Sequence, residues 1–194
     1  PQPTIVAAAQ EVLDIAQDVI GPSVKRHLFA FAHERETRLA AAGCRTQLVL
    51  DDLFELPDDG MRYELADGCL LMSPAPSPRH GESQFYLREV LQRQAPAGIA
   101  VSGDLGIRIG SNFTYFIPDL YVIPVTAFRA HPTYLLPADV KLAVEILSEH
   151  NRGRDLVLKR HYYASVGIPR YWIVDPFEHT LTVLEQSIDL EDRL

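Results

Sequence analysis

Cysteine is scarce in this sequence, and long apolar runs are missing from it. The 194 residues include two cysteines, Cys44 and Cys69, which is too few for a disulfide framework and provides no metal-ligand spacing. Two isolated thiols fit a reducing compartment. No apolar stretch reaches the roughly 18 residues that a membrane-spanning helix needs, and residues 1–9 lack the basic start and apolar run of a signal peptide. These absences predict a cytoplasmic protein that does not associate with membranes.

Several short catalytic motifs are also absent. The sequence contains no Gly-x-x-x-x-Gly-Lys loop for nucleotide phosphates, and neither a His-Glu-x-x-His nor a Cys-x-x-Cys motif for zinc. It also lacks the Gly-x-Ser-x-Gly turn of serine hydrolases. These kinds of site are therefore excluded.

Positive charge is in the minority. Lys and Arg number 18 against 26 Asp and Glu, which gives a net charge of −8 and a pI of about 5.3. This balance argues against a protein that coats nucleic acid non-specifically, because phosphate binding needs cationic side chains. The composition is otherwise that of an ordinary globular domain, with 47% hydrophobic and 23% charged residues.

The first part of the chain has a purely helical pattern. Apolar residues recur at helical spacing over residues 5–20 and again over 24–39, and a glycine-proline pair between the two segments can end one helix and begin the next. This pattern predicts an N-terminal helical extension, a helical hairpin, over residues 1–45. A separate domain is expected over residues 46–194.

The remaining sequence alternates strand-like and helical patterns. This order predicts an α/β or α+β domain in which helices flank one central mixed sheet. The expected elements are a hairpin at 63–72, a helix at 79–94, strands at 99–102, 106–109, 115–123 and 141–147, a helix at 152–166, and strands at 171–174 and 180–184.

Two acidic residues lie in or beside apolar strand patterns. Glu145 interrupts the apolar run of residues 142–147, and a carboxylate in a buried strand has to be paired, bind a metal or reach solvent. Asp119 stands between Pro118 and the apolar run of residues 120–123, where a strand would begin. Two carboxylates on neighbouring strands can converge on one divalent cation, and their oxygen atoms suit Mg²⁺ or Mn²⁺. A wet strand face for Glu145 and a simple turn for Asp119 are the alternatives.

The predicted helix over 152–166 brings further candidates. Lys159 and Tyr163 are four residues apart and share a helix face. A lysine directed at a carboxylate pair can position a water or stabilise negative charge that develops on a phosphate. Residues 150–170 contain five Lys and Arg against one acid, which makes the segment a candidate phosphate-binding surface. An ordinary solvated helix face is the alternative for both.

His80 and Glu64 are candidates on weaker grounds. His80 follows a Pro-rich loop at the start of a predicted helix, a position that favours anions, although an exposed histidine is the simpler interpretation. Glu64 alternates with apolar neighbours in a predicted strand. Its side chain either faces solvent or supplies a third acid near the site.

These residues fit the pattern of a known family. Over residues 48–186 the sequence resembles the Uma-two family, a domain-of-unknown-function group associated with restriction endonucleases. The matching segments, in order, are residues 63–68, 73–80, 118–120, 144–148, 154–159, 163–164, 167–169 and 171–176. The resemblance implies the fold of the PD-(D/E)XK nuclease superfamily, a four-stranded mixed sheet flanked by helices with a metal site at one edge. Residues 1–45 lie outside the resemblance.

The resemblance also implies roles for individual residues. Asp119 matches the acid of the Pro-Asp element, and Glu145 matches the second acid. The superfamily motif has a lysine two residues after that acid, where this chain has Leu147, and Lys159 in the following helix is the matching position instead. Three further family positions are matched by Glu64, His80 and Tyr163.

The sequence thus predicts a metal-dependent endonuclease that hydrolyses phosphodiester bonds of DNA. Asp119 and Glu145 are expected to hold Mg²⁺ or Mn²⁺, together with the main-chain carbonyl of Ile146, and Lys159 is expected to orient the attacking water. A homodimer is expected, because cutting two strands needs two sites. The expected contacts to the DNA backbone are Arg152, Arg154 and Arg160.

Two other functions fit the same residues. One is an inactive nuclease-fold protein that serves binding or assembly, in which residues 1–45 contact a partner. The other is a metal-dependent hydrolase of a small phosphoester. Because the chain is acidic outside residues 150–170, any nucleic-acid binding is expected to be weak, salt-sensitive and confined to the face that holds the site.

Overall fold

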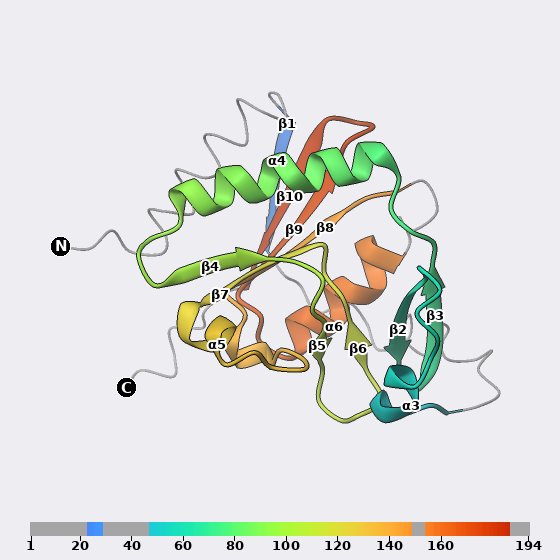
Figure 1. Ribbon diagram of the computed structural model, residues 1–194. Coiled ribbons are helices and arrows are strands. Elements are labelled where there is room, and N and C mark those ends of the chain that lie inside the picture. The colour runs from blue at the N-terminus through green and yellow to red at the C-terminus, as the bar shows by residue number, and fades with distance from the viewer. Residues whose placement is uncertain (1–22, 29–46, 149–153, 187–194) are drawn as a thin grey trace.

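Two β-sheets with helices packed around them make up the fold. The computed structural model describes residues 23–28, 47–148 and 154–186 (Figure 1). Within them, a six-stranded sheet has the strand order β1-β10-β9-β8-β7-β4, and a four-stranded sheet has the order β3-β2-β6-β5. The α/β class and the central mixed sheet flanked by helices are confirmed. The prediction of a single sheet is wrong, because the strands are divided between two.

The large sheet is mixed. β1 runs parallel to β10 and β8 parallel to β9, whereas the β10–β9, β8–β7 and β7–β4 pairs are antiparallel. Its strands are β1 (Ser23–Leu28), β4 (Ile99–Ser102), β7 (Leu120–Pro124), β8 (Leu142–Ile146), β9 (Arg170–Asp175) and β10 (Thr180–Glu185).

The small sheet is antiparallel throughout. Its strands are β2 (Arg62–Ala66), β3 (Cys69–Ser73), β5 (Ile107–Arg108) and β6 (Tyr115–Phe116). The helical elements of the described residues are α3 (Leu50–Phe54), α4 (Pro78–Gln94), α5 (Val125–Arg129), a 3₁₀ turn η1 (Pro137–Asp139), a π-helical segment η2 (Arg154–Lys159) and α6 (Arg160–Ser165). None of these helices is both long and apolar enough to cross a membrane.

The large sheet is the middle layer of the molecule. α4 crosses one face of it (Figure 1), and Leu87 and Leu91 pack there on the buried side chains of the strands. α6 packs on the other face in a cluster that includes Phe116 of the small sheet. Because side chains alternate along a strand, Val144 faces α4, whereas Glu145 faces the side of α6 and the small sheet.

The hairpin predicted around residues 67 and 68 is confirmed. β2 and β3 pair antiparallel, and the two residues between them, Asp67 and Gly68, have φ angles of +49° and +82°. Two consecutive residues with positive φ make the tight turn that matches the twist of a hairpin, and Asp-Gly is among the best sequences for it. This local signal was strong enough to fix the register of both strands.

The single strand predicted over residues 115–123 is wrong. The structure has β6 and β7 there, in different sheets, with Ile117, Pro118 and Asp119 between them. Pro118 has no N–H to donate to a neighbouring strand, and the N–H of Ile117 donates to the Glu64 side chain rather than to a strand. The chain therefore passes from one sheet to the other at this point.

Residues 23–28, predicted as part of the second N-terminal helix, form β1 at the edge of the large sheet. Val24 pairs with Leu181 and Leu28 with Glu185. A spacing of four residues between apolar positions is a multiple of the strand period of two, so Val24 and Leu28 fit a strand as well as a helix. The remaining residues of the predicted hairpin, 1–22 and 29–45, lie outside the described residues, and the boundary near residue 45 stays a prediction.

The helix predicted over residues 152–166 is present from residue 154 onward, but it is not a uniform α-helix. It begins as the π-helical segment η2 and continues as α6, which ends before Gly167 with φ of +77°. π-helical turns are wider than α-helical turns and often occur at functional sites. Lys159 is the last residue of this segment.

Candidate active site

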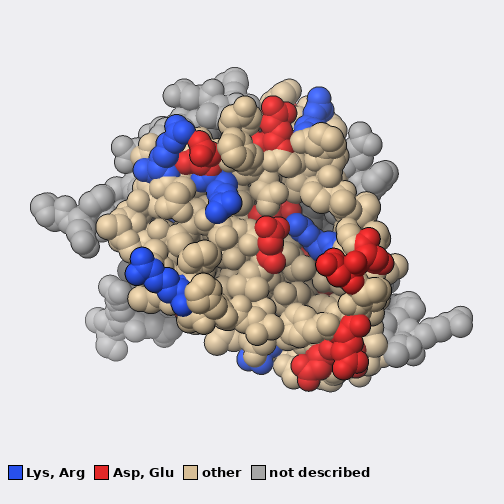
Figure 2. Space-filling view, in the orientation of Figure 1, with Lys and Arg blue, Asp and Glu red and all other residues tan. Residues whose placement is uncertain are grey.

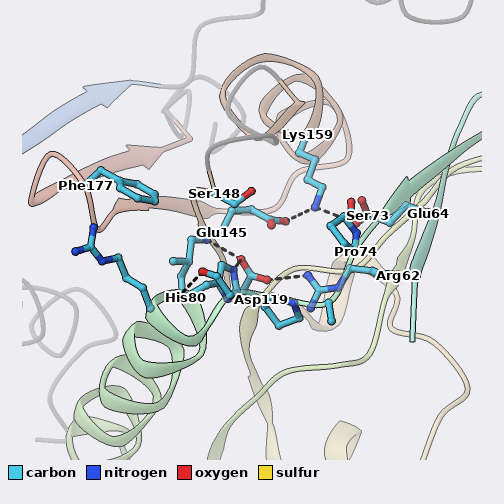
Figure 3. Close-up of a pocket in the computed structure, with 15 residues that line it drawn as sticks. Arg62, Glu64, Ser73, Pro74, His80, Asp119, Glu145, Ser148, Lys159 and Phe177 are labelled. Carbon is cyan, nitrogen blue, oxygen red and sulfur yellow. Dashed lines mark hydrogen bonds and ion pairs between the residues drawn. The ribbon is translucent and has the colours of Figure 1, made fainter. Parts of the chain in front are cut away.

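A hollow of about 450 Å³ opens where the two sheets and the N-terminus of α4 meet. Phe177 lies at one end of the hollow and Arg62 and Glu64 at the other, with Asp119 and Glu145 between them (Figure 3). The other lining residues are Ser73, Pro74, Ala75, Pro76, Ser77, Arg79, His80, Ile146, Ser148 and Lys159.

The two predicted acids lie opposite each other on neighbouring strands. Leu120 of β7 pairs with Val144 of β8, and Tyr121 pairs with Ala143. Continuing this register by one residue sets Asp119 against Glu145, on the same face of the sheet. Both side chains are 2% exposed. Two like charges in such positions repel, so the fold has to supply cations beside them.

Asp119 is held by four donors. Its Oδ1 is 2.7 Å from a guanidinium nitrogen of Arg62, and its Oδ2 is 3.0 Å from Nε2 of His80 and accepts the N–H of Ile146 at 2.7 Å. Gln84 of α4 donates to its main-chain carbonyl. Burial by itself would raise the pKa of Asp119, but the hydrogen bond and charge of His80, with the charges of Arg62 and Lys159, lower it to about 2.

Arg62 is matched to Asp119 in turn. Burial lowers the pKa of the Arg62 guanidinium, but the charge of Asp119 and the hydrogen bond to it more than offset this, so its pKa lies above the usual value. Arg62 therefore remains a cation inside the hollow.

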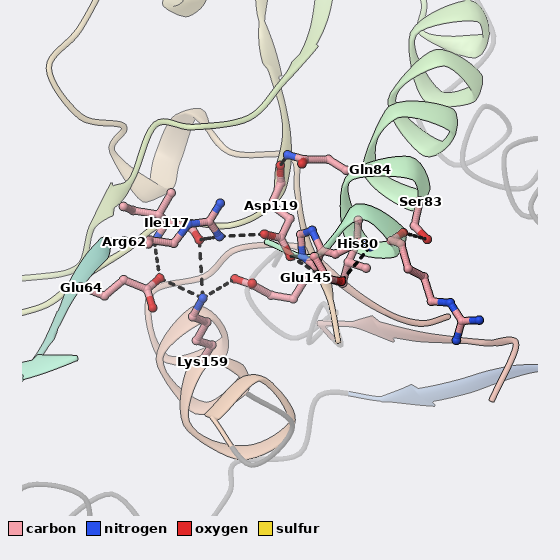
Figure 4. A network of polar contacts seen from close by, with 12 residues as sticks. Arg62, Glu64, His80, Ser83, Gln84, Ile117, Asp119, Glu145 and Lys159 are labelled. Atoms are coloured by element: carbon pink, nitrogen blue, oxygen red, sulfur yellow. Dashed lines mark hydrogen bonds and ion pairs between the residues drawn. The ribbon is translucent and has the colours of Figure 1, made fainter. Parts of the chain in front are cut away.

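Lys159 lies between two carboxylates. Its Nζ is 2.8 Å from Oε1 of Glu145 and 2.9 Å from Oε1 of Glu64 (Figure 4). The hydroxyl of Tyr163 also donates to Oε1 of Glu145, at 3.3 Å. Lys159, Glu64 and Glu145 are each at most 2% exposed, so the lysine pairs with two buried charges at once.

Glu64 also links the hollow to the segment of residues 117–119, where the chain passes from the small sheet to the large one. Its Oε1 accepts the N–H of Ile117 at 2.7 Å, and the carbonyl of Ile117 faces Nζ of Lys159 and the guanidinium of Arg62 at 3.5 Å each. The segment that carries Asp119 is therefore fixed by the same side chains that complete the hollow.

The hollow offers a small set of ligands for a divalent cation. Among the residues that the structure describes, no three His, Cys, Asp or Glu side chains form a metal cage. Mg²⁺, however, is commonly bound by one or two carboxylates, with water and substrate phosphate oxygens completing its coordination. The paired carboxylates of Asp119 and Glu145 fit such a cation. Arg62 and Lys159 are the groups that now neutralise them.

Most of the predicted site residues come together. The hollow contains Asp119, Glu145, Ile146, Lys159, Glu64 and His80, and Tyr163 contacts it through Glu145. The three arginines predicted to contact DNA do not extend this group. Arg160 is half-buried and does not line the hollow, whereas Arg152 and the side chain of Arg154 lie outside the described part of the chain.

Arg62, Arg79 and Phe177 are lining residues that the sequence did not indicate. Arg62 carried one usable signal. It lies just before the hairpin predicted over residues 63–72 and two residues before Glu64, so in β2 both side chains share a face. Arg79 lies in the family-matching segment 73–80 but was given no role there, and Phe177 carried no signal. The two meet through the packing of the α4 N-terminus against the β9–β10 turn.

A solved structure defines the class of fold. The crystal structure of a "putative nuclease belonging to DUF820" from Anabaena variabilis ATCC 29413 is similar to the chain with a TM-score of 0.58 and 19% sequence identity. The match covers 73% of this chain and 82% of that one. At this identity the likeness shows the fold alone, which the chain shares with that protein.

The sequence supplies the family. The chain belongs to the Uma2 family, described as "Putative restriction endonuclease", whose model matches residues 50–192. The resemblance inferred from the motifs is thereby confirmed. No curated protein sequence matches the chain at a significant level.

Proposed function

We propose that this protein is an endonuclease that hydrolyses phosphodiester bonds of DNA with the help of Mg²⁺ or Mn²⁺. One observation carries the proposal: the opposed carboxylates of Asp119 and Glu145, with Lys159 bonded to Glu145, lie in a hollow that is open to a substrate. Membership of a family described as "Putative restriction endonuclease" supports the same reaction.

Asp119 and Glu145, with the main-chain carbonyl of Ile146, are the groups proposed to hold the cation. A bound cation of this kind lowers the pKa of a water molecule and polarises a phosphate. Hydrolysis joins the water oxygen to phosphorus and breaks the bond from phosphorus to the ester oxygen. The products are a phosphomonoester and an alcohol that takes up a proton.

The cationic side chains of the hollow have roles of their own. Lys159 is fixed between two carboxylates, so its ammonium group can orient a water and offset negative charge on the phosphate without moving. Arg62 is the second cation, and its planar guanidinium can pair with two phosphate oxygens. Lys159 is buried and Arg62 is partly buried, which strengthens their attraction for an anion.

A nuclease assay with matched variants tests the proposal. The parent should cut DNA in Mn²⁺ or Mg²⁺ but not in EDTA, and Asp119→Asn should cut at least about 100-fold more slowly. Lys159→Arg keeps the charge and tests geometry, whereas Lys159→Met removes the charge. Asp58→Asn, at an exposed position, serves as the control. Thermal melts show whether each variant is folded.

The outcomes separate the alternatives. A parent that cuts no DNA with any divalent cation, or an Asp119→Asn variant that is folded and cuts as fast as the parent, contradicts the proposal. A parent that cleaves small phosphoesters but no polynucleotide favours the small-substrate hydrolase. An inactive binding protein is favoured if calorimetry detects no Mn²⁺ binding, since Arg62 and Lys159 already balance the acids.

A further inference from the structure

A second depression adjoins the hollow along α4. It has a volume of about 270 Å³ and lies between the first turns of α4 and the turn from β9 to β10. Arg79 lines both the hollow and this depression, so the two are neighbours along one surface. The depression is lined further by Tyr86, Leu87, Val174, Pro176 and His179.

Aromatic side chains mark both spaces. The guanidinium of Arg79 lies over the ring of Phe177, 5.2 Å from its centroid, in the wall of the hollow. Tyr86 in the depression is 54% exposed, and the adjacent Phe85 is 60% exposed. Large exposed aromatic side chains beside a site commonly mark a contact surface.

Among the described residues of this surface, positive charge is too sparse to hold a polynucleotide by its phosphates alone. On the face shown in Figure 2, Lys and Arg side chains are scattered among acidic ones and form no continuous patch. Arg79 is accompanied in the depression by Glu82 and Asp175. A strand bound along this surface therefore has to gain affinity from its bases.

Aromatic rings bind bases by stacking, which requires a free base face. In a duplex these faces are stacked on neighbouring base pairs, whereas in a single strand they are available. The depth of the two acids in the hollow also favours a single strand, because Asp119 and Glu145 are only 2% exposed. A flexible strand can bend into the hollow, whereas a duplex is stiff over about 150 base pairs.

We propose that Arg79, Phe177 and Tyr86 form a binding track for a single-stranded stretch of DNA. The base next to the cleaved phosphate stacks on the Arg79–Phe177 pair, and the following base packs against Tyr86 in the second depression. The position of the cleaved phosphate rests on the function proposed above, but the track itself rests on these three residues.

Binding can be measured without cleavage. Fluorescence anisotropy in EDTA compares a labelled single-stranded oligonucleotide with a duplex of the same sequence. The parent should bind the single strand more tightly. Phe177→Ala and Phe177→Leu should weaken that binding about 5- to 30-fold, whereas Phe177→Trp should retain it. Phe128→Ala, at a 43% exposed position on α5, is the matched control and should bind like the parent.

Two outcomes would refute the binding track. The track is refuted if the duplex binds as tightly as the single strand, or if a folded Phe177→Leu variant binds like the parent. Phe177→Leu preserves apolar bulk without a ring, so the test stands even if Phe177→Ala does not fold.

Abasic substrates then distinguish the track from the catalytic proposal. Removing one base next to the cut should slow cleavage by the parent, while Phe177→Ala should be insensitive to the same removal. Cleavage that ignores the abasic position in both proteins overturns the track and leaves the nuclease intact. Ring-dependent binding of single strands without any cleavage supports the track and refutes the nuclease.

Discussion

At the scale of single residues, the site is defined by how few of its charges are exposed. Asp119, Glu145, Glu64 and Lys159 are nearly inaccessible, yet each has a charged partner within hydrogen-bond distance. Buried charges are expensive unless they are paired in this way. Removing one partner therefore affects folding as well as chemistry, which is why conservative variants are the informative ones.

Acid stability should report the environment of Asp119. Its pKa is about 2 in the folded protein and about 3.9 in an unfolded chain. The ionised carboxyl therefore stabilises the fold above about pH 4, and this contribution of about 2 kcal/mol is lost as the pH falls from about 4 to 2. Asp119→Asn should lose less stability than the parent over this range. Urea unfolding of both proteins at a series of pH values measures this difference in the free energy of unfolding.

The exposed control again separates this effect from general acid sensitivity. Asp58→Asn should follow the parent curve. If Asp119→Asn loses stability with falling pH as steeply as the parent does, the carboxyl of Asp119 is not the group responsible.

The acids were predictable from the sequence because Glu145 interrupts an apolar strand pattern and Asp119 stands directly before another. The family resemblance placed Lys159 beside them. The pairing of Arg62 with Asp119 was not predictable. The two residues are 57 positions apart, and only the packing of the small sheet against the large one brings them together. A local pattern can show that a carboxylate needs a partner but does not reveal which cation supplies it.

At the scale of helices and strands, some features follow from local sequence signals and others depend on which distant segment packs alongside. The β2–β3 hairpin and α4 depend on local signals: an Asp-Gly turn for the hairpin, and for α4 the Ser77 N-cap, whose side chain accepts the N–H of His80. β1 and the separation of β6 from β7 depend on which strand lies alongside. Pro118 marks the break between β6 and β7, but the local sequence does not show which strand each segment pairs with, so both features were predicted wrongly.

Two glycines near the site should respond oppositely to alanine. A Cβ on Gly103 would lie 2.5 Å from the main-chain oxygen of Asp119 and 3.1 Å from Nε2 of Gln84, which donates to that oxygen. Gly103→Ala should therefore cost about 1–3 kcal/mol and reduce cleavage by moving Asp119. Gly81 in α4 has no atom within 4 Å of such a Cβ, so Gly81→Ala should stabilise the helix by about 0.5–1 kcal/mol. Chemical denaturation gives the change in stability of each variant, and the cleavage assay gives its change in activity.

Equal stability of the two alanine variants would contradict the close approach of Gly103 to Asp119. A Gly103→Ala protein that is less stable but fully active would show that the contact supports the fold without positioning the acid.

At the scale of the whole molecule, the net charge of −8 and the scattered cations limit the electrostatic part of any nucleic-acid binding. If only two or three cations meet phosphates, the slope of log K against log salt should be about −1 to −2 for a single strand. Anisotropy titrations at several salt concentrations measure this slope. A slope much steeper than that would require a basic surface beyond the hollow. The homodimer stays a prediction.

Two backbone amides of the hollow can report on its carboxylates by NMR. The amide of Ile117 donates to Glu64 and the amide of Ile146 donates to Asp119, each at 2.7 Å. A ¹⁵N-labelled sample therefore carries one backbone resonance for each of two carboxylates. Titration with a diamagnetic cation such as Mg²⁺ would shift these two resonances to different extents, so the carboxylate that is engaged first can be identified without any substrate.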